Sequence, residues 1–64
     1  IVAFEQLEAT ALALHPGSTL LDTDLDEAYG KYVYEVELED RNGIEWDVEL
    51  DALTGQVLKN HQDT

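Results

Sequence analysis

The chain has 64 residues and a formal net charge of −12, from 15 acidic and three basic side chains. A surface this acidic repels the phosphates of nucleic acids and anionic lipids, so we expect no nucleic-acid partner. The sequence has no cysteine, which excludes a thiol nucleophile, a disulfide bond and a thiolate metal site. The length allows one domain, residues 1–64, and no stretch is long and apolar enough for direct membrane insertion. Because the sequence begins with Ile1, we expect a segment of a longer precursor from which any targeting sequence was removed.

A helix is predicted over about residues 3–14. Its apolar stripe is made by residues at spacings of three and four, namely Phe4, Leu7, Ala11 and Leu14. The sequence His15-Pro16-Gly17 ends the helix, because proline disfavours helical backbone at the residue before it and glycine permits a sharp turn.

Four strands are predicted after the helix, over about residues 19–26, 32–39, 44–50 and 56–59. Alternation assigns most apolar side chains to one face, formed by Thr19, Leu21, Thr23, Leu25, Tyr32, Tyr34, Val36, Leu38, Ile44, Trp46, Val48 and Leu50. The loop 27–31 contains Tyr29, which is expected to be exposed, and the polar tail 60–64 is expected to fray. The predicted fold class is α+β: one N-terminal helix packs on one face of a three- to four-stranded antiparallel sheet, a helix followed by a β-meander.

The register of the hairpin between the second and third strands follows from parity. A two-residue turn would place carboxylates and core residues on the same face, which the alternation forbids. A three-residue loop, 41–43, instead pairs Asp40 with Ile44 and Leu38 with Trp46. We therefore expect Trp46 to pack in the core, beneath the helix.

The same register brings acids together on the other face. It predicts the cross-strand pairs Glu35–Glu49, Glu37–Asp47 and Glu39–Glu45. The first strand can add Asp22, Asp24 and Asp26, with Leu20 on the same side and no basic residue in between. Like charges directly opposite each other destabilise a sheet. Two interpretations stay open: a solvated face that keeps a small domain soluble and unaggregated, or a docking face for a cation or a basic partner.

The sequence offers weak metal candidates and no catalytic set. Asp22, Asp24 and Asp26 have the spacing that opens an EF-hand loop, but Glu27 and Val33 stand where that loop needs glycine and glutamate, so only loose calcium binding is expected. His15 and His61 are interpreted as structural. We find no nucleophile-and-base set and no phosphate loop, and expect neither catalysis nor a cofactor. One helix on a small sheet should also leave little room for a pocket of about 300 Å³.

Several short motifs resemble the PepSY domain. They are His15-Pro16-Gly17 after a helix, then Tyr34-Glu35-Val36-Glu37-Leu38 followed by Asn42-Gly43, then Val48-Glu49-Leu50-Asp51-Ala52-Leu53-Thr54-Gly55-Gln56-Val57-Leu58. The resemblance covers nearly the whole chain in order. The first strand is more acidic than is usual in that family, and the helix lacks a capping side chain.

The resemblance implies a binding or regulatory role. PepSY domains are similar to segments in the propeptides of thermolysin-like metallopeptidases, for which inhibitory or chaperone-like roles are proposed. It implies a periplasmic or secreted location and a protein partner, such as a peptidase or a basic protein, and it supplies no catalytic residues to carry over. The expected function is a non-catalytic protein-binding module that modulates or inhibits an extracellular peptidase. The alternatives are a calcium-responsive acidic module and a purely structural domain, either a monomer or a weak edge-strand homodimer.

Overall fold

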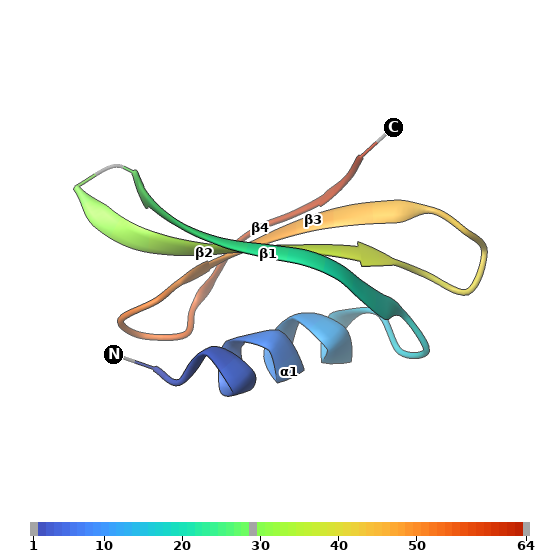
Figure 1. Cartoon of the computed structure of the whole chain (residues 1–64), viewed down its shortest axis with the longest axis horizontal. Coiled ribbons are helices and arrows are strands. Elements are labelled where there is room, and N and C mark those ends of the chain that lie inside the picture. The colour runs from blue at the N-terminus through green and yellow to red at the C-terminus, as the bar shows by residue number, and fades with distance from the viewer. Residues whose placement is uncertain (1, 29, 64) are drawn as a thin grey trace.

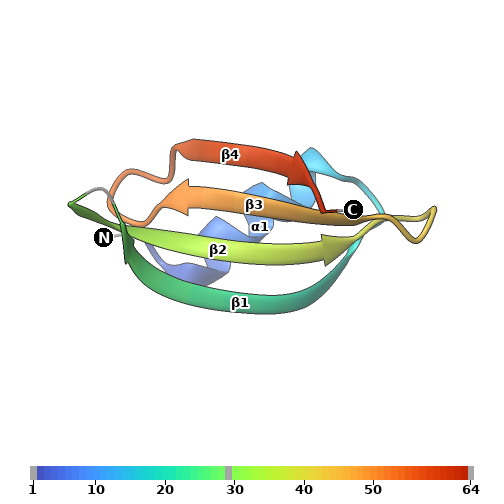
Figure 2. The same cartoon turned by 90° about the horizontal axis from the view of Figure 1, so that it is seen from above.

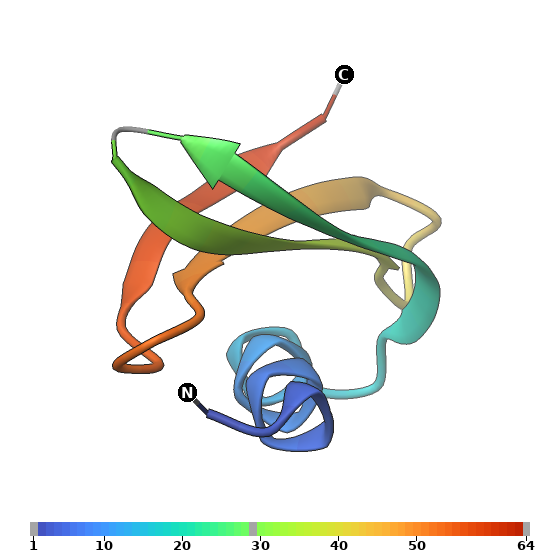
Figure 3. The same ribbon diagram turned by 60° about the vertical axis from the view of Figure 1, so that its left-hand side comes forward.

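The computed structural model of the chain describes residues 2–28 and 30–63. Helix α1 (Phe4–Leu14) is followed by strands β1 (Thr19–Ala28), β2 (Lys31–Glu39), β3 (Glu45–Asp51) and β4 (Val57–Gln62). The strands form one antiparallel sheet in chain order, β1-β2-β3-β4. The helix lies against one face of this sheet and the other face is open (Figure 1, Figure 3). The predicted α+β arrangement, a helix followed by a β-meander, is confirmed.

None of the helices in the described part of the chain is long and apolar enough to cross a membrane.

The core lies between α1 and the two central strands. Leu7 and Ala11 of the helix are fully buried against the apolar side chains of β2 and β3. Those strand residues are Tyr34, Val36, Leu38, Val48 and Leu50. Burying one side chain of the size of valine or leucine stabilises the fold by about 1.5–3 kcal/mol. The centre of the predicted apolar face is thus confirmed as the core.

The two ends of the helix stripe are less buried than the sequence predicted. Phe4 is 44% exposed and Leu14 is 40% exposed. The reason is geometric, because α1 has 11 residues and crosses behind the sheet at an angle to the strands, so that its middle turns, with Leu7 and Ala11, are the most deeply buried (Figure 2). Phe4 still stacks on the ring of Tyr34, with 4.8 Å between ring centroids. Tyr32, also predicted on the core face, is 56% exposed.

The hairpin between β2 and β3 has the predicted three-residue loop. Asp40 N donates to Ile44 O at 2.9 Å, and Gly43 has a φ of +78°, the left-handed conformation that such a loop requires. The register pairs Leu38 with Trp46, and Tyr34 and Val36 meet their predicted partners on β3.

Trp46 lies on the core side but outside the buried cluster. It is half-buried near the end of the sheet, and its ring stacks on the ring of His15 at 4.4 Å between centroids. Trp46 therefore lies on the predicted side of the sheet but is less buried than predicted. The reason is that α1 ends at Leu14, so the indole stacks on His15 after the helix rather than under a helical turn.

A β-bulge changes the predicted alternation at the start of β1. The register shifts between Leu20 and Asp22, so that Leu20 pairs with Leu38 and Asp22 pairs with Glu37. Leu21 is the extra residue, and it reverses the sides of the residues before it. Leu20 therefore lies on the helix side and Thr19 on the acidic side, opposite to the prediction.

The last strand is longer than predicted. β4 runs from Val57 to Gln62 rather than over 56–59, and beyond it Asp63 N donates to Glu45 O at 2.9 Å. The expected fraying from residue 60 is wrong as far as Asp63, because main-chain bonds to β3 hold these polar residues. The first strand likewise continues to Ala28, into the predicted loop 27–31. The prediction for Tyr29 falls outside the described residues.

Leu38→Ala tests the position of the core. Leu38 is fully buried, so its truncation should lower the free energy of unfolding by about 2–5 kcal/mol. That is much of the total stability, on the order of 3–10 kcal/mol, expected for a chain of this length. Urea unfolding followed by Trp46 fluorescence measures the change. The matched control is Leu53→Ala: Leu53 is 70% exposed, and its truncation should change the stability by less than about 0.5 kcal/mol. Equal effects of the two variants would contradict this core.

Candidate functional site

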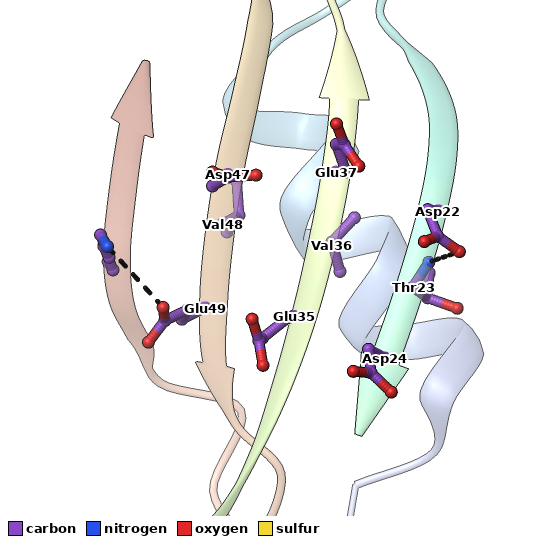
Figure 4. A pocket seen from close by; sticks show the side chains of 10 residues that line it. Asp22, Thr23, Asp24, Glu35, Val36, Glu37, Asp47, Val48 and Glu49 are labelled. Atoms are coloured by element: carbon purple, nitrogen blue, oxygen red, sulfur yellow. Dashed lines mark hydrogen bonds and ion pairs between the residues drawn. The ribbon is translucent and has the colours of Figure 1, made fainter. Parts of the chain in front are cut away.

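The open face of the sheet carries the acids that the sequence placed there. The register confirms the pairs Glu35–Glu49, Glu37–Asp47 and Glu39–Glu45 between β2 and β3. On the other side of β2, Asp22 pairs with Glu37 and Asp24 pairs with Glu35. We call this surface the acidic face; its members are Asp22, Asp24, Asp26, Glu35, Glu37, Glu39, Glu45, Asp47 and Glu49. Figure 4 shows six of them, Asp22, Asp24, Glu35, Glu37, Asp47 and Glu49.

The acidic face is hollowed rather than flat. A shallow, open depression of about 340 Å³ is lined by carboxylates of β1, β2 and β3 and by one lysine of β4, namely Asp22, Asp24, Glu35, Glu37, Asp47, Glu49 and Lys59. The expectation that a small sheet leaves too little room for such a space is wrong. The depression is open to solvent and its lining is dominated by charge, so it is suited to a charged surface or chain rather than to an enclosed apolar ligand.

Strand β4 adds basic side chains that the sequence analysis did not place on this face. Lys59 pairs in register with Glu49, and its Nζ lies 3.8 Å from Glu49 Oε2. His61 pairs with Asp47. Simple alternation from Val57, which pairs with Leu50, would place Lys59 on the core side. The register shift between this pair and the pair of Lys59 with Glu49 moves Lys59 to the acidic face, and no signal in the sequence marks that shift. An exposed ion pair of this kind contributes little, about 0–1 kcal/mol, so it relieves the repulsion only along one border.

The electrostatics of the two central glutamates record the crowding of negative charge. Partial burial raises the pKa of Glu35, and the charges of Glu49, Asp26 and Asp24 add to the effect. A hydrogen bond shared with Glu45 raises the pKa of Glu37, together with loss of hydration and the nearby charge of Asp47. In both residues the surroundings disfavour the ionised form.

The three metal candidates of β1 do not converge. Strand geometry spreads Asp22, Asp24 and Asp26 along one edge, and two of them bind backbone instead. Asp22 Oδ1 accepts from Thr23 N and Asp26 Oδ1 accepts from Glu27 N, each at 2.9 Å.

A different trio does converge within the described residues. Glu37, Glu45 and Asp63 each offer a carboxylate oxygen, and these oxygens lie within 4.8 Å of one another. Carboxylate oxygens are the ligands that calcium prefers. Asp63 was not among the predicted candidates because residues 60–64 were expected to fray, whereas the hydrogen bond from Asp63 N to Glu45 O holds this residue beside β3.

Asp51 stabilises the turn that follows β3. Asp51 Oδ1 accepts from Leu53 N at 2.8 Å and from Thr54 N at 3.4 Å, and Lys31 Nζ lies 3.5 Å from Oδ2. These bonds hold the pKa of Asp51 below its usual value. Asp51 is thus the turn-forming residue that its position before Ala52-Leu53-Thr54-Gly55 predicts.

Asp40 plays the same part in the β2–β3 loop. A hydrogen bond from the Trp46 indole, and then those from Ile44 N and Asn42 N, lower the pKa of its carboxyl group.

The two histidines lie in separate structural settings. His15 follows the last turn of α1, and its Nε2 lies 2.8 Å from Asn60 Oδ1 on β4, which ties the helix end to the edge of the sheet. His61 lies on β4 and pairs with Asp47. The interpretation of His15 as a helix-terminal structural residue agrees with these contacts.

The pKa directions predict a stability maximum at mildly acidic pH. Glu35 and Glu37 have pKa values raised above the reference of 4.5, so the folded chain binds more protons than the unfolded chain near and above that pH. Stability should rise as the pH falls from 7 towards about 4.5. Asp40 and Asp51 have pKa values lowered below 3.8, so their contribution is lost as the pH falls below that value.

Urea unfolding between pH 3 and pH 8 measures this profile. The double variant Glu35→Gln/Glu37→Gln should flatten the rise between pH 7 and about 4.5 and leave the acid limb in place. A wild-type stability that falls between pH 7 and about 5 would contradict the assignment.

Comparison with known proteins agrees with the fold and its motifs. Residues 1–61 match the family described as PepSY, "Peptidase propeptide and YPEB domain". The chain is 36% identical over 63 residues to the protein of Bacillus subtilis (strain 168) called "Uncharacterized protein YkoJ", and the alignment covers 97% of this chain and 37% of that protein. The chain therefore spans little more than a third of the length of this relative. No solved structure matches the chain significantly. The chain belongs to the PepSY family.

Proposed function

We propose that this PepSY domain is a non-catalytic binding module whose acidic face docks a basic surface of a protein partner. The observation that carries the proposal is the pairing of like charges on an open face, Glu35 with Glu49 and Glu37 with Asp47. Direct pairs of this kind weaken a sheet. A lysine or arginine side chain of a partner placed between them would turn repulsion into attraction, so the free domain is less favourable than the bound one.

The family supports the kind of partner and its location. PepSY domains are generally propeptide-like modules without catalysis and are typically extracytoplasmic. We infer that this domain acts in the periplasm or outside the cell and that its partner is a peptidase, which it modulates or inhibits. The shape of the acidic face fits this role, because an open depression lined by charge can receive a projecting basic loop.

The raised pKa values of Glu35 and Glu37 do not by themselves indicate catalysis. Catalytic carboxyl groups gain such shifts in clefts that exclude water. Here the depression is open, and negative neighbours on β1 and β3 add to the effect of partial burial on the pKa of Glu35. Partial burial and mutual repulsion on a docking face account for a shift of this kind without a catalytic role.

Binding to purified secreted metallopeptidases from the source organism tests the proposal. We expect binding at micromolar concentration that weakens at least about tenfold when salt is raised from 0.05 to about 0.5 M. The variant Glu35→Gln/Asp47→Asn should weaken binding by a similar factor, because it removes charge from the centre of the acidic face. The matched control is Glu5→Gln/Glu27→Gln, which removes the same charge from exposed positions outside the acidic face. An equal loss with both variants would indicate an effect of net charge alone, and no binding at all would remove the proposal.

One observation favours a second candidate, a calcium-responsive module. The oxygens of Glu37, Glu45 and Asp63 converge from β2, β3 and the residue after β4. A divalent cation there would relieve the same repulsion that a basic partner would, and it would join three parts of the sheet at one end. This trio replaces Asp22, Asp24 and Asp26 as the place to look for calcium.

A thermal melt distinguishes the two candidates. With about 5 mM calcium, the second candidate predicts a larger rise in Tm than sodium chloride of equal ionic strength gives. Calcium binding should raise the free energy of unfolding by RT ln(1 + [Ca²⁺]/Kd). Glu45→Gln should abolish this excess, whereas Glu49→Gln, on the same strand but outside the trio, should keep it. Equal shifts with calcium and with matched sodium chloride would leave only the binding module.

A further inference from the structure

Strand β1 forms one edge of the sheet and leaves apolar side chains uncovered. It pairs only with β2, and α1 packs on the two central strands (Figure 2). Leu20 is 38% exposed although its register partner Leu38 is fully buried. Leu25 is 42% exposed although its partner Tyr34 is 4% exposed. The helix therefore does not fully cover β1. Two partly exposed leucines lie on the helix side of this strand, and acidic residues lie on its other side.

The hydrogen-bonding parity of β1 identifies the groups that point outward. Ala52 N donates to Tyr32 O, so even-numbered residues of β2 bond to β3 and odd-numbered residues of β2 bond to β1. Their partners in β1 after the bulge are the even-numbered residues. The outward groups are those of Thr23, Leu25 and Glu27. The bonds from Thr23 N to Asp22 Oδ1 and from Glu27 N to Asp26 Oδ1 agree with this parity, since both amides are free of the ladder.

The outer edge is therefore partly closed. Two of its three outward N–H groups are held by the carboxylates of the preceding aspartates, at 2.9 Å each. The N–H of Leu25, between them, has no such carboxylate within the described residues, and the outward carbonyl groups are also open. An added strand can use these groups at once, but it must displace two carboxylates to complete its ladder.

We propose that the outer edge of β1 binds an extended segment of a partner in which basic residues alternate with apolar ones. A strand added there points alternate side chains to opposite faces. One set lies beside Asp22 and Asp24 on the acidic face, and the other set covers Leu20 and Leu25. This proposal rests on the proposed function. It adds the kind of partner segment that the domain binds, an extended basic one, and the mode of binding, which is strand addition to β1.

The two carboxylates that close the edge make it selective. A neutral or acidic strand must break the hydrogen bonds that Thr23 N and Glu27 N donate to Asp22 and Asp26. It offers no positive charge to the two carboxylates that it displaces. A basic strand offers ion pairs to the same carboxylates as they leave the amides. A second copy of this chain is the least suitable occupant, because antiparallel pairing of two β1 strands sets their aspartates against each other and joins two chains that each carry −12.

Capped synthetic peptides of seven residues provide the test. The first alternates lysine with valine, the second has the same composition in block order, and the third alternates glutamate with valine. Hydrogen exchange by NMR follows the amide of Leu25 in the intact chain. The alternating lysine peptide should slow this exchange at least about tenfold near saturation, and the other two peptides should not.

Paired variants localise the effect. Asp22→Asn/Asp24→Asn should weaken binding of the alternating lysine peptide at least about fivefold. The control Asp47→Asn/Glu49→Gln makes the same change of charge two strands away and should weaken binding less. Both double variants remove repulsion from the sheet, so neither is expected to unfold it.

The outcomes separate this inference from the proposed function. If both lysine peptides bind equally and leave Leu25 exchange unchanged, docking on the acidic face survives and the edge proposal is overturned. If the glutamate peptide protects Leu25 as well, the requirement for basic residues is wrong. If neither lysine peptide binds, both proposals fall.

Discussion

In the loop between β2 and β3, one carboxylate accepts three hydrogen bonds, and these bonds set the register of the central hairpin. Asp40 Oδ1 receives the backbone amides of Asn42 and Ile44, and Oδ2 receives the indole N–H of Trp46. A shift of one residue in the register of this hairpin would turn the glutamates of β2 towards α1 and the core side chains of β2 towards water. The buried core and the acidic face are therefore two results of a single loop geometry.

The carboxylates of this chain fall into two groups that the surroundings treat in opposite ways. Asp40 and Asp51 accept backbone amides in loops, and their pKa values are lowered, so ionisation stabilises the fold there. Glu35 and Glu37 lie among other acids, and their pKa values are raised, so ionisation weakens it. Solubility alone does not require direct pairs, since charges could be interspersed with opposite sign. The direct pairing of like charges on the acidic face is the observation from which we propose a partner of opposite charge.

Much of the fold and of the acidic face could be predicted, because the alternation of side chains along the strands allows few registers. The odd loop, the core pairs of β2 and β3 and the three acidic pairs follow from period-two alternation. The bulge at Leu21 could not be predicted, since one extra residue in an edge strand leaves no local signal and reverses the side of Leu20. The length of β4 was missed for another reason: its last residues are polar, and pairing with β3 overrides their weak strand preference. That error hid Asp63, and the register shift in β4 hid the side on which Lys59 lies, so the borders of the candidate site were not predicted.

The free edge of β1 bears both on self-association and on the proposed binding of another chain. Exposed edge strands invite pairing, and natural proteins protect them with charge. In β1 the charged groups also occupy the outward amides, so Asp22 and Asp26 oppose a second strand both by repulsion and by competition for hydrogen bonds. Under the proposal above, a strand that brings lysine or arginine would replace the repulsion by attraction and would offer ion pairs to the carboxylates that it displaces from the amides. The leucines left exposed on the helix side then supply the apolar contact that charge alone lacks. Under the proposal, the same two carboxylates of one edge would therefore both oppose self-association and select a basic partner.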